Sequence, residues 1–211
     1  MKPILDEVAK YKIVPVIKLE KPSDVLPLGN ALLEGGLPIS EITFRTAAAR
    51  EAIRLLRESY PSILVGAGTV ITIEQVIHAR DAGAKFIVTP GFNPRIVDYC
   101  LANDIPVIPG VNSPTQIEQG LERRLFLLKF FPAEASGGIK MLKALNGPYS
   151  DVLFIPTGGI DQSNLLQYIQ LKNVAAVGGS WMVKEDLIAS SRFDEISRLC
   201  REALSIVQKV K

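Results

Sequence analysis

Runs of apolar, often β-branched residues recur along the chain and alternate with segments whose apolar residues follow a helical repeat. The runs are typical of strands buried on both faces, as in a parallel sheet, and the helical repeats are typical of amphipathic helices. Turn residues separate the two kinds of segment. The pattern therefore predicts eight parallel strands, at residues 12–18, 39–45, 63–67, 85–89, 105–109, 125–131, 152–156 and 174–178.

Helical patterns lie between these strands, and several begin with Ser or Thr, which are common N-cap residues. A short amphipathic helix also precedes the first strand. Eight strand–helix units in about 200 residues favour an α/β fold of the (β/α)8 TIM barrel type with an extra N-terminal helix, as a single domain over residues 1–211. The alternative is an open, doubly wound sheet, because alternation alone does not distinguish a closed sheet from an open one.

Composition narrows the class of protein further. The 211 residues are 47% hydrophobic and 22% charged, as in ordinary globular proteins, and the net charge of +2 is too small to indicate a nucleic-acid partner. No apolar run approaches the roughly 20 residues of a membrane span, and the first residues do not resemble a signal peptide. We therefore expect a cytoplasmic protein without a membrane partner. Cys100 and Cys200 lie in helical patterns and are expected to be packed free thiols.

Polar residues near the ends of apolar strands are the candidate site, because barrel active sites lie at the carboxyl ends of the strands. Glu41, Thr43 and Arg45 share one face of the second predicted strand, since side chains alternate along a strand. If that face points inward, the carboxylate and the guanidinium need a partner or a ligand. A buried Glu41–Arg45 pair with a purely structural role is the alternative.

Lys129 stands in the apolar run LFLLKFFPAEA, on the same face as Leu127 and Phe131. A lysine there either reaches solvent from the strand end or remains buried. Burial favours the neutral amine, which can attack a carbonyl and form a Schiff base. Glu41 is then the candidate general base for the proton transfers.

Two glycine pairs end the last two predicted strands, in PTGGI and VGGS. Backbone amides at such turns can bind an anion, and barrel enzymes often bind phosphate after strands seven and eight. The alternative is that these glycines only provide tight turns with positive φ. The turns GAGT and TPG after the third and fourth strands add Thr69 and Pro90 to the same rim.

The chain lacks the residues and motifs that several other kinds of active site require. His78 is the only histidine and falls in a helical pattern, which argues against a Ser-His-Asp triad and against a catalytic zinc site. Neither GxGxxG nor GxxxxGK[ST] occurs, so nicotinamide and nucleoside-triphosphate binding have no support. We therefore expect no metal and no cofactor.

The sequence resembles the 2-keto-3-deoxy-6-phosphogluconate (KDPG) and 4-hydroxy-2-oxoglutarate aldolases over about residues 13–187. The segments that carry the resemblance are EITFRT, GAGTV, VTPGFNP, PGV, LKFFPAEASGG, KALNGPY, PTGGI and GGSW, in the family's order. One departure is Glu122-Arg123-Arg124 before the sixth strand, where the resemblance leads us to expect a glycine that closes the helix. The resemblance implies a (β/α)8 barrel, a homotrimer and a metal-independent class I aldolase that releases pyruvate and glyceraldehyde 3-phosphate.

The same resemblance implies a role for each candidate residue. Lys129 would be the Schiff-base lysine and Glu41 the carboxylate that transfers protons. The other positions would bind a phosphorylated keto acid: Arg45 and Thr69 its carboxylate end, Pro90 and Phe131 as pocket walls, and Gly158, Gly159, Gly179 and Ser180 its phosphate. Lys18 could contact the carboxylate or face solvent.

Three other functions remain open at this stage. Two are enzymatic, namely cleavage of the galactonate epimer and cleavage of 4-hydroxy-2-oxoglutarate, which lacks a phosphate. The third is a non-catalytic barrel that binds a phosphosugar. Lys129 beside Glu41 distinguishes the last from the aldolases, because a binding protein does not need a buried amine.

Overall fold

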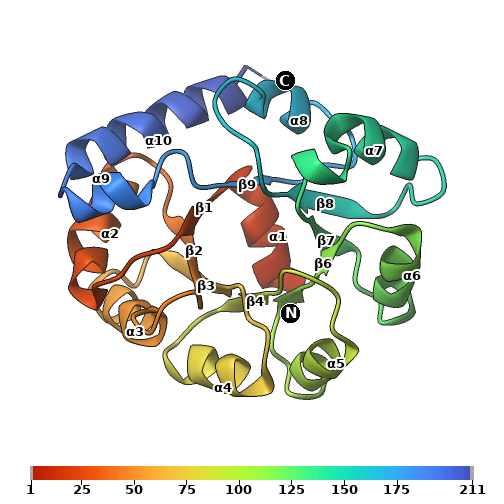
Figure 1. The fold of residues 1–211 in the computed structure, drawn as a ribbon, viewed down its shortest axis with the longest axis horizontal. Coiled ribbons are helices and arrows are strands. Elements are labelled where there is room, and N and C mark those ends of the chain that lie inside the picture. The colour runs from red at the N-terminus through yellow and green to blue at the C-terminus, as the bar shows by residue number, and fades with distance from the viewer. Residues whose placement is uncertain (1, 210–211) are drawn as a thin grey trace.

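A computed structural model describes residues 2–209 and shows parallel strands inside a ring of helices (Figure 1). The strands are short: β1 (Ile13–Ile17), β2 (Ile39–Thr43), β3 (Leu64–Gly68), β4 (Phe86–Val88), β5 (Val107–Ile108), β6 (Gly110–Val111), β7 (Leu127–Phe130), β8 (Leu153–Pro156) and β9 (Val177–Gly179). The helices are α1 (Lys2–Lys10), α2 (Val25–Glu34), α3 (Ala49–Ser59), α4 (Ile73–Asp81), α5 (Pro94–Ala102), α6 (Pro114–Glu122), α7 (Gly138–Leu145), α8 (Leu165–Ile169), α9 (Glu185–Ala189) and α10 (Phe193–Val207), with 3-10 turns at Pro22–Asp24 and Glu134–Ser136.

All strand pairs are parallel, in the orders β5-β4-β3-β2-β1-β9 and β6-β7-β8. The first strand pairs with β2 on one side and with the last strand, β9, on the other. Two isolated parallel bridges connect the regions of β8 and β9. One joins Phe154 of β8 to Val174, which precedes β9, and the other joins Thr157, which follows β8, to Gly178 of β9. The predicted α/β fold is therefore confirmed as a curled, parallel sheet surrounded by helices.

Most predicted strands differ from the observed ones by one or two residues at an end, and the fifth and eighth differ more. The fifth, at 105–109, continues to Val111 and divides into β5 and β6 around Pro109, which has no N–H to donate. β5 pairs with β4, and β6 pairs with β7. The eighth, at 174–178, is regular only from Val177, because Val174 forms an isolated bridge to Phe154.

The predicted N-terminal helix is α1, which Figure 1 shows in the middle of the molecule, within the curve of the strands. Its buried residue Val8 belongs to an apolar cluster inside the curled sheet, in which Ile39, Leu64, Phe86 and Leu127 are the first residues of their strands. This inner apolar cluster contains Val8, Val14, Ile39, Leu64, Phe86, Val88, Ile108, Leu127, Ile155, Ala175 and Ala176. α1 therefore covers the amino-terminal end of the sheet, which is the end opposite to the predicted site.

Local sequence signals fix several helix ends. Thr72 accepts a hydrogen bond from the Gln75 amide, and the Gln75 side chain bonds back to the Thr72 amide, which completes a capping box before α4. Ser113 precedes α6 in the same way, but its side chain makes no capping bond. Arg124 adopts a φ of 58° after α6, so a non-glycine residue takes the left-handed conformation at a helix end where glycine was expected.

The two cysteines are buried free thiols, as predicted. Burial raises the pKa of Cys100 and of Cys200 to about 12, so both remain protonated at neutral pH. Within residues 2–209, no helix is long and apolar enough to cross a membrane.

Candidate active site

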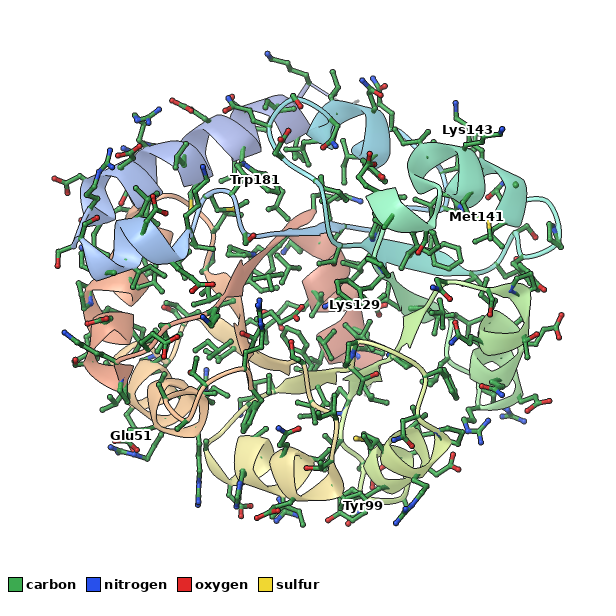
Figure 2. The ribbon with its side chains drawn as sticks, in the orientation of Figure 1. Glu51, Tyr99, Lys129, Met141, Lys143 and Trp181 are labelled. Carbon is green, nitrogen blue, oxygen red and sulfur yellow. The ribbon has the colours of Figure 1, made fainter. Side chains whose placement is uncertain are left out.

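Lys129 on β7 and Glu41 on β2 form a buried ion pair inside the curled sheet. The lysine Nζ lies 3.0 Å from the glutamate Oε1, and the two side chains are only 5% and 4% exposed. Figure 2 shows Lys129 near the centre of the molecule, whereas Glu51, Tyr99 and Lys143 lie at its edge. The two residues are 88 positions apart in the sequence, and the alternation of side chains along their strands turns both inward.

Both structural alternatives for these residues are wrong. Lys129 does not reach solvent, and the ionic partner of Glu41 is Lys129 instead of Arg45. Arg45 lies two residues beyond the end of β2 and is exposed. A buried ion pair carries a large desolvation cost that its mutual attraction offsets only in good geometry, so it is an expensive way to stabilise a fold.

The surroundings of the pair hold its geometry. A Cβ on Gly68 of β3 would lie 2.2 Å from Glu41 Oε1, so only glycine leaves room for this carboxylate. On the other side, Lys129 Nζ lies 5.3 Å from the centre of the Phe131 ring, which is within the range of a cation–π contact. An interior gap of about 10 Å³, lined by both residues and by Val8 of α1, leaves space for no more than about one water.

A cavity of about 570 Å³ opens at the carboxyl ends of the strands. Its floor includes Thr43 and Phe131, each two residues beyond a member of the ion pair on the same strand face. The buried amine and carboxylate therefore lie one layer of side chains below the cavity. The other lining residues are Val16, Ile17, Lys18, Arg45, Thr157, Gly158, Gly159, Ile160, Gly179, Ser180, Val183, Lys184, Glu185 and Asp186.

The two predicted glycine turns both line this cavity, but glycine is required in each turn for a different reason. Gly158 and Gly159 have φ values of 101° and 77°, which strongly favour glycine. Gly178 and Gly179 do not have positive φ. A Cβ on Gly178 would lie 2.2 Å from Thr157 Oγ1, and a Cβ on Gly179 would lie 1.8 Å from the ring of Trp181. The second pair is required by close packing.

Two predicted pocket residues lie away from this cavity. Pro90 lines a separate hollow of about 310 Å³, together with Ile71 and Phe92. Thr69 follows β3 with a φ of 53° and is half-buried, and it is not among the lining residues of either space. Backbone strain at a β-branched residue is common at functional positions, and Thr69 is adjacent to Gly68, which contacts the Glu41 carboxylate.

Several lining residues were not predicted from the sequence. Thr157 is a buried polar residue just after β8, within the segment PTGGI that was selected for its glycines. Thr157, like Arg45, is a polar residue at the end of an apolar run, and this feature of the sequence would have identified it as a candidate. Lys184 and Glu185 come from the start of α9, and no strand-end rule points to them. Lys18, for which the sequence left open a contact to the substrate carboxylate or a position in solvent, does line the cavity and is paired with Glu20 and Glu185.

The geometry combines a buried amine, a carboxylate in hydrogen-bonding distance and a polar cavity with two glycine turns. Such a site can form an imine with a carbonyl and bind an anionic group at a distance from it. Over residues 4–199, the chain matches the family model of the KDPG and KHG aldolases. The chain belongs to the KDPG and KHG aldolase family.

Relatives in this family match nearly the whole chain. A 2-dehydro-3-deoxy-phosphogluconate aldolase of Haemophilus influenzae is 51% identical over 97% of this chain and 97% of its own length. A KHG/KDPG aldolase of Escherichia coli is 41% identical over 91% of this chain and 90% of its own. The crystal structure of KDPG aldolase from Legionella pneumophila, with pyruvate captured as a covalent carbinolamine intermediate, superposes with a TM-score of 0.89. It is 43% identical and covers 91% of this chain and 93% of its own.

Proposed function

We propose that this chain is a class I aldolase that reversibly cleaves 2-keto-3-deoxy-6-phosphogluconate to pyruvate and glyceraldehyde 3-phosphate. The observation that carries the proposal is the buried Lys129–Glu41 pair, 3.0 Å apart, directly below a cavity with two glycine turns. A covalent pyruvate carbinolamine in the Legionella relative supports imine chemistry in this family.

In the proposed reaction, Glu41 accepts a proton from the Lys129 ammonium, and the neutral amine attacks the C2 ketone. Glu41 then gives this proton to the carbinolamine hydroxyl, which leaves as water, so that an iminium ion forms and Glu41 is again a carboxylate. The C4 hydroxyl then loses its proton to Glu41, directly or through water, the C3–C4 bond breaks, and its electron pair moves into the iminium to form an enamine. Protonation of the enamine at C3 and hydrolysis release pyruvate and restore Lys129.

The remaining candidates position the two charged ends of the substrate. Arg45 binds the carboxylate, and Phe131 forms an apolar wall of the cavity. The family resemblance gives Thr69 and Pro90 the same two roles, although neither residue lines this cavity. The phosphate binds to the two turns that line the cavity: Gly158, Gly159, Gly179 and Ser180. Binding energy at the phosphate is remote from the reacting bond and helps to orient the substrate for cleavage.

A second activity on 4-hydroxy-2-oxoglutarate fits the same site, since this acid has the same ketone and C4 hydroxyl but no phosphate. The E. coli relative carries both substrates in its name, which supports this side reaction. The galactonate epimer remains a further candidate substrate. A non-catalytic binding role is disfavoured, because it provides no reason for a desolvated lysine beside a glutamate.

Two features of the assembly belong to the same proposal. We infer that both sheets form one closed (β/α)8 barrel, which the β1–β9 pairing and the two bridges beside β9 support. We also infer, from the family resemblance, that the chain forms a homotrimer and needs neither metal nor cofactor, and, from its sequence, that it acts in the cytoplasm.

Borohydride trapping tests the Schiff base directly. Reduction of the protein in the presence of pyruvate should give one stable pyruvate-derived increment per chain by intact mass spectrometry. Peptide mapping should place the increment in the segment LLKFFPAEA, and Lys129→Ala should lose both the adduct and the aldolase activity. The mechanism is wrong if no adduct forms or if the label lies on Lys18, Lys85 or Lys143.

A further inference from the structure

Charged side chains gather at one part of the cavity rim that the proposed reaction leaves without a role. They are Lys18, Arg45, Lys184, Glu185 and Asp186. The proposed function assigns only Arg45, to the substrate carboxylate. The strand order β2-β1-β9 places Lys18, which follows β1, between Arg45 after β2 and Ser180 after β9. Lys18 therefore stands beside the phosphate turn, on the side that faces the carboxylate end.

Lys18 is held at this place by two acids. Its Nζ lies 2.7 Å from Glu185 Oε2 and 3.0 Å from Glu20 Oε1. These hydrogen bonds, first that to Glu185, raise the pKa of Lys18 above its ordinary value, so the side chain is fully charged at neutral pH. The Lys18 side chain lines the cavity and is 23% exposed. Its two partners are more exposed, Glu185 at 53% and Glu20 at 71%, so Lys18 is the least solvated of the three charged groups.

The two ion pairs add little to the free energy of unfolding, because both acidic partners are exposed to solvent. They do hold a cation in reach of a ligand and can release it, since both acids remain in water. A phosphate dianion that enters the cavity carries twice the charge of one carboxylate and offers several acceptor oxygens. Lys184 is less suited to the same task, because it is exposed and also lines a neighbouring hollow.

We propose that Lys18 is a specificity-determining residue that binds the substrate phosphate together with the Gly158-Gly159 and Gly179-Ser180 turns, and that Glu185 competes with the phosphate for it. The inference rests on the proposed function for the identity of the substrate. Lys18 then favours phosphorylated acids over 4-hydroxy-2-oxoglutarate, and Glu185 limits the affinity for phosphate.

Variants of Lys18 and of Glu185 should change KM for the phosphorylated acid in opposite directions. If the ion pair had only a structural role, both variants would act in the same direction. Lys18→Met keeps the length of the side chain but removes its charge, and it should raise KM for the phosphorylated acid about 10- to 100-fold. The KM for 4-hydroxy-2-oxoglutarate should change less than about 3-fold. Glu185→Gln frees Lys18 and should lower KM for the phosphorylated acid. Lys143→Met, on the outer helix α7 (Figure 2), is the matched control and should change neither value.

Titration with inorganic phosphate, followed by phosphorus NMR, separates this inference from the proposed reaction. Lys18→Met should weaken phosphate binding, Glu185→Gln should strengthen it, and Lys143→Met should leave it unchanged. This readout decides the role of Lys18 even if the protein does not cleave the phosphorylated acid, which would overturn the proposed function alone. The inference is wrong if Lys18→Met binds phosphate like the unmodified protein, or if both partners' variants weaken both substrates equally.

Discussion

At the scale of single residues, the Lys129–Glu41 pair separates binding of the ketone from movement of protons. Glu41→Gln keeps the size and polarity of the side chain and cannot accept a proton. We expect the variant to retain part of the borohydride adduct with pyruvate, while its cleavage rate falls by about 10² to 10⁴. Steady-state rates and trapped mass on the same samples measure the two effects.

Glu51→Gln is the matched control, because Glu51 lies on the outer face of α3 and forms its ion pair with Arg54 in solvent (Figure 2). It should leave both the adduct and the rate unchanged. If Glu41→Gln cleaved the substrate at the normal rate, the carboxylate would have no part in proton transfer.

The sequence predicted the inward face of Glu41 and Lys129, because alternation along an apolar strand has only two outcomes. The proposed roles placed Glu41 within reach of Lys129, but the apolar pattern alone did not fix their direct contact of 3.0 Å. That contact joins strands that are not neighbours in either sheet, and it depends on the absence of a side chain at Gly68. Arg124 shows a different limit, since the backbone takes a left-handed φ there although the residue is not glycine.

At the scale of elements, the Gly158-Gly159 turn is supported from behind by the segment after β7. The Glu134 amide donates to the Gly158 carbonyl over 3.1 Å, and the Glu134 carboxylate accepts a hydrogen bond from the buried Tyr168 hydroxyl of α8. Burial, together with this bond, raises the pKa of Tyr168, so the phenol remains a donor. The turn that is proposed to bind phosphate is therefore fixed by contacts from two other elements.

Gly159→Ala tests this turn. The alanine Cβ would lie 2.7 Å from Glu134 at a φ of 77°, so the turn must shift. KM for the phosphorylated acid should rise about 10-fold or more, in line with the loss of a hydrogen bond to a charged group, and 4-hydroxy-2-oxoglutarate should be affected much less. Gly147→Ala is a suitable control, because its Cβ would make only an ordinary contact of 3.6 Å. Equal losses on both substrates would remove the phosphate from this turn.

The apolar pattern predicted the existence and the order of the strands. It did not predict where the fifth strand is interrupted or where the eighth strand begins. Pro109 interrupts the fifth strand, and the pattern of apolar residues does not change there. The eighth strand begins late because Val174 meets Phe154 only at a single bridge. The first difference combines a local proline with a change of partner from β4 to β7, and the second comes from a pairing partner that is distant in sequence.

At the scale of the whole molecule, the homotrimer is a prediction from family resemblance alone. Light scattering coupled to gel filtration should give a mass close to three times the 23.0 kDa of the chain at micromolar concentration. A monodisperse species at 23.0 kDa would contradict it. Nothing in the apolar pattern of a single chain fixes the number of copies, because exposed apolar residues also occur on monomers.

The position of α1 has a consequence for the order in which products leave. Val8 and its neighbours close the base beneath Lys129, and the cavity lies on the opposite side. Pyruvate would be bonded at the bottom of this chamber, with the phosphorylated aldehyde above it, so the aldehyde must depart first. Pyruvate should then inhibit cleavage competitively, and glyceraldehyde 3-phosphate should inhibit it noncompetitively. Competitive inhibition by both products would mean that they leave in either order.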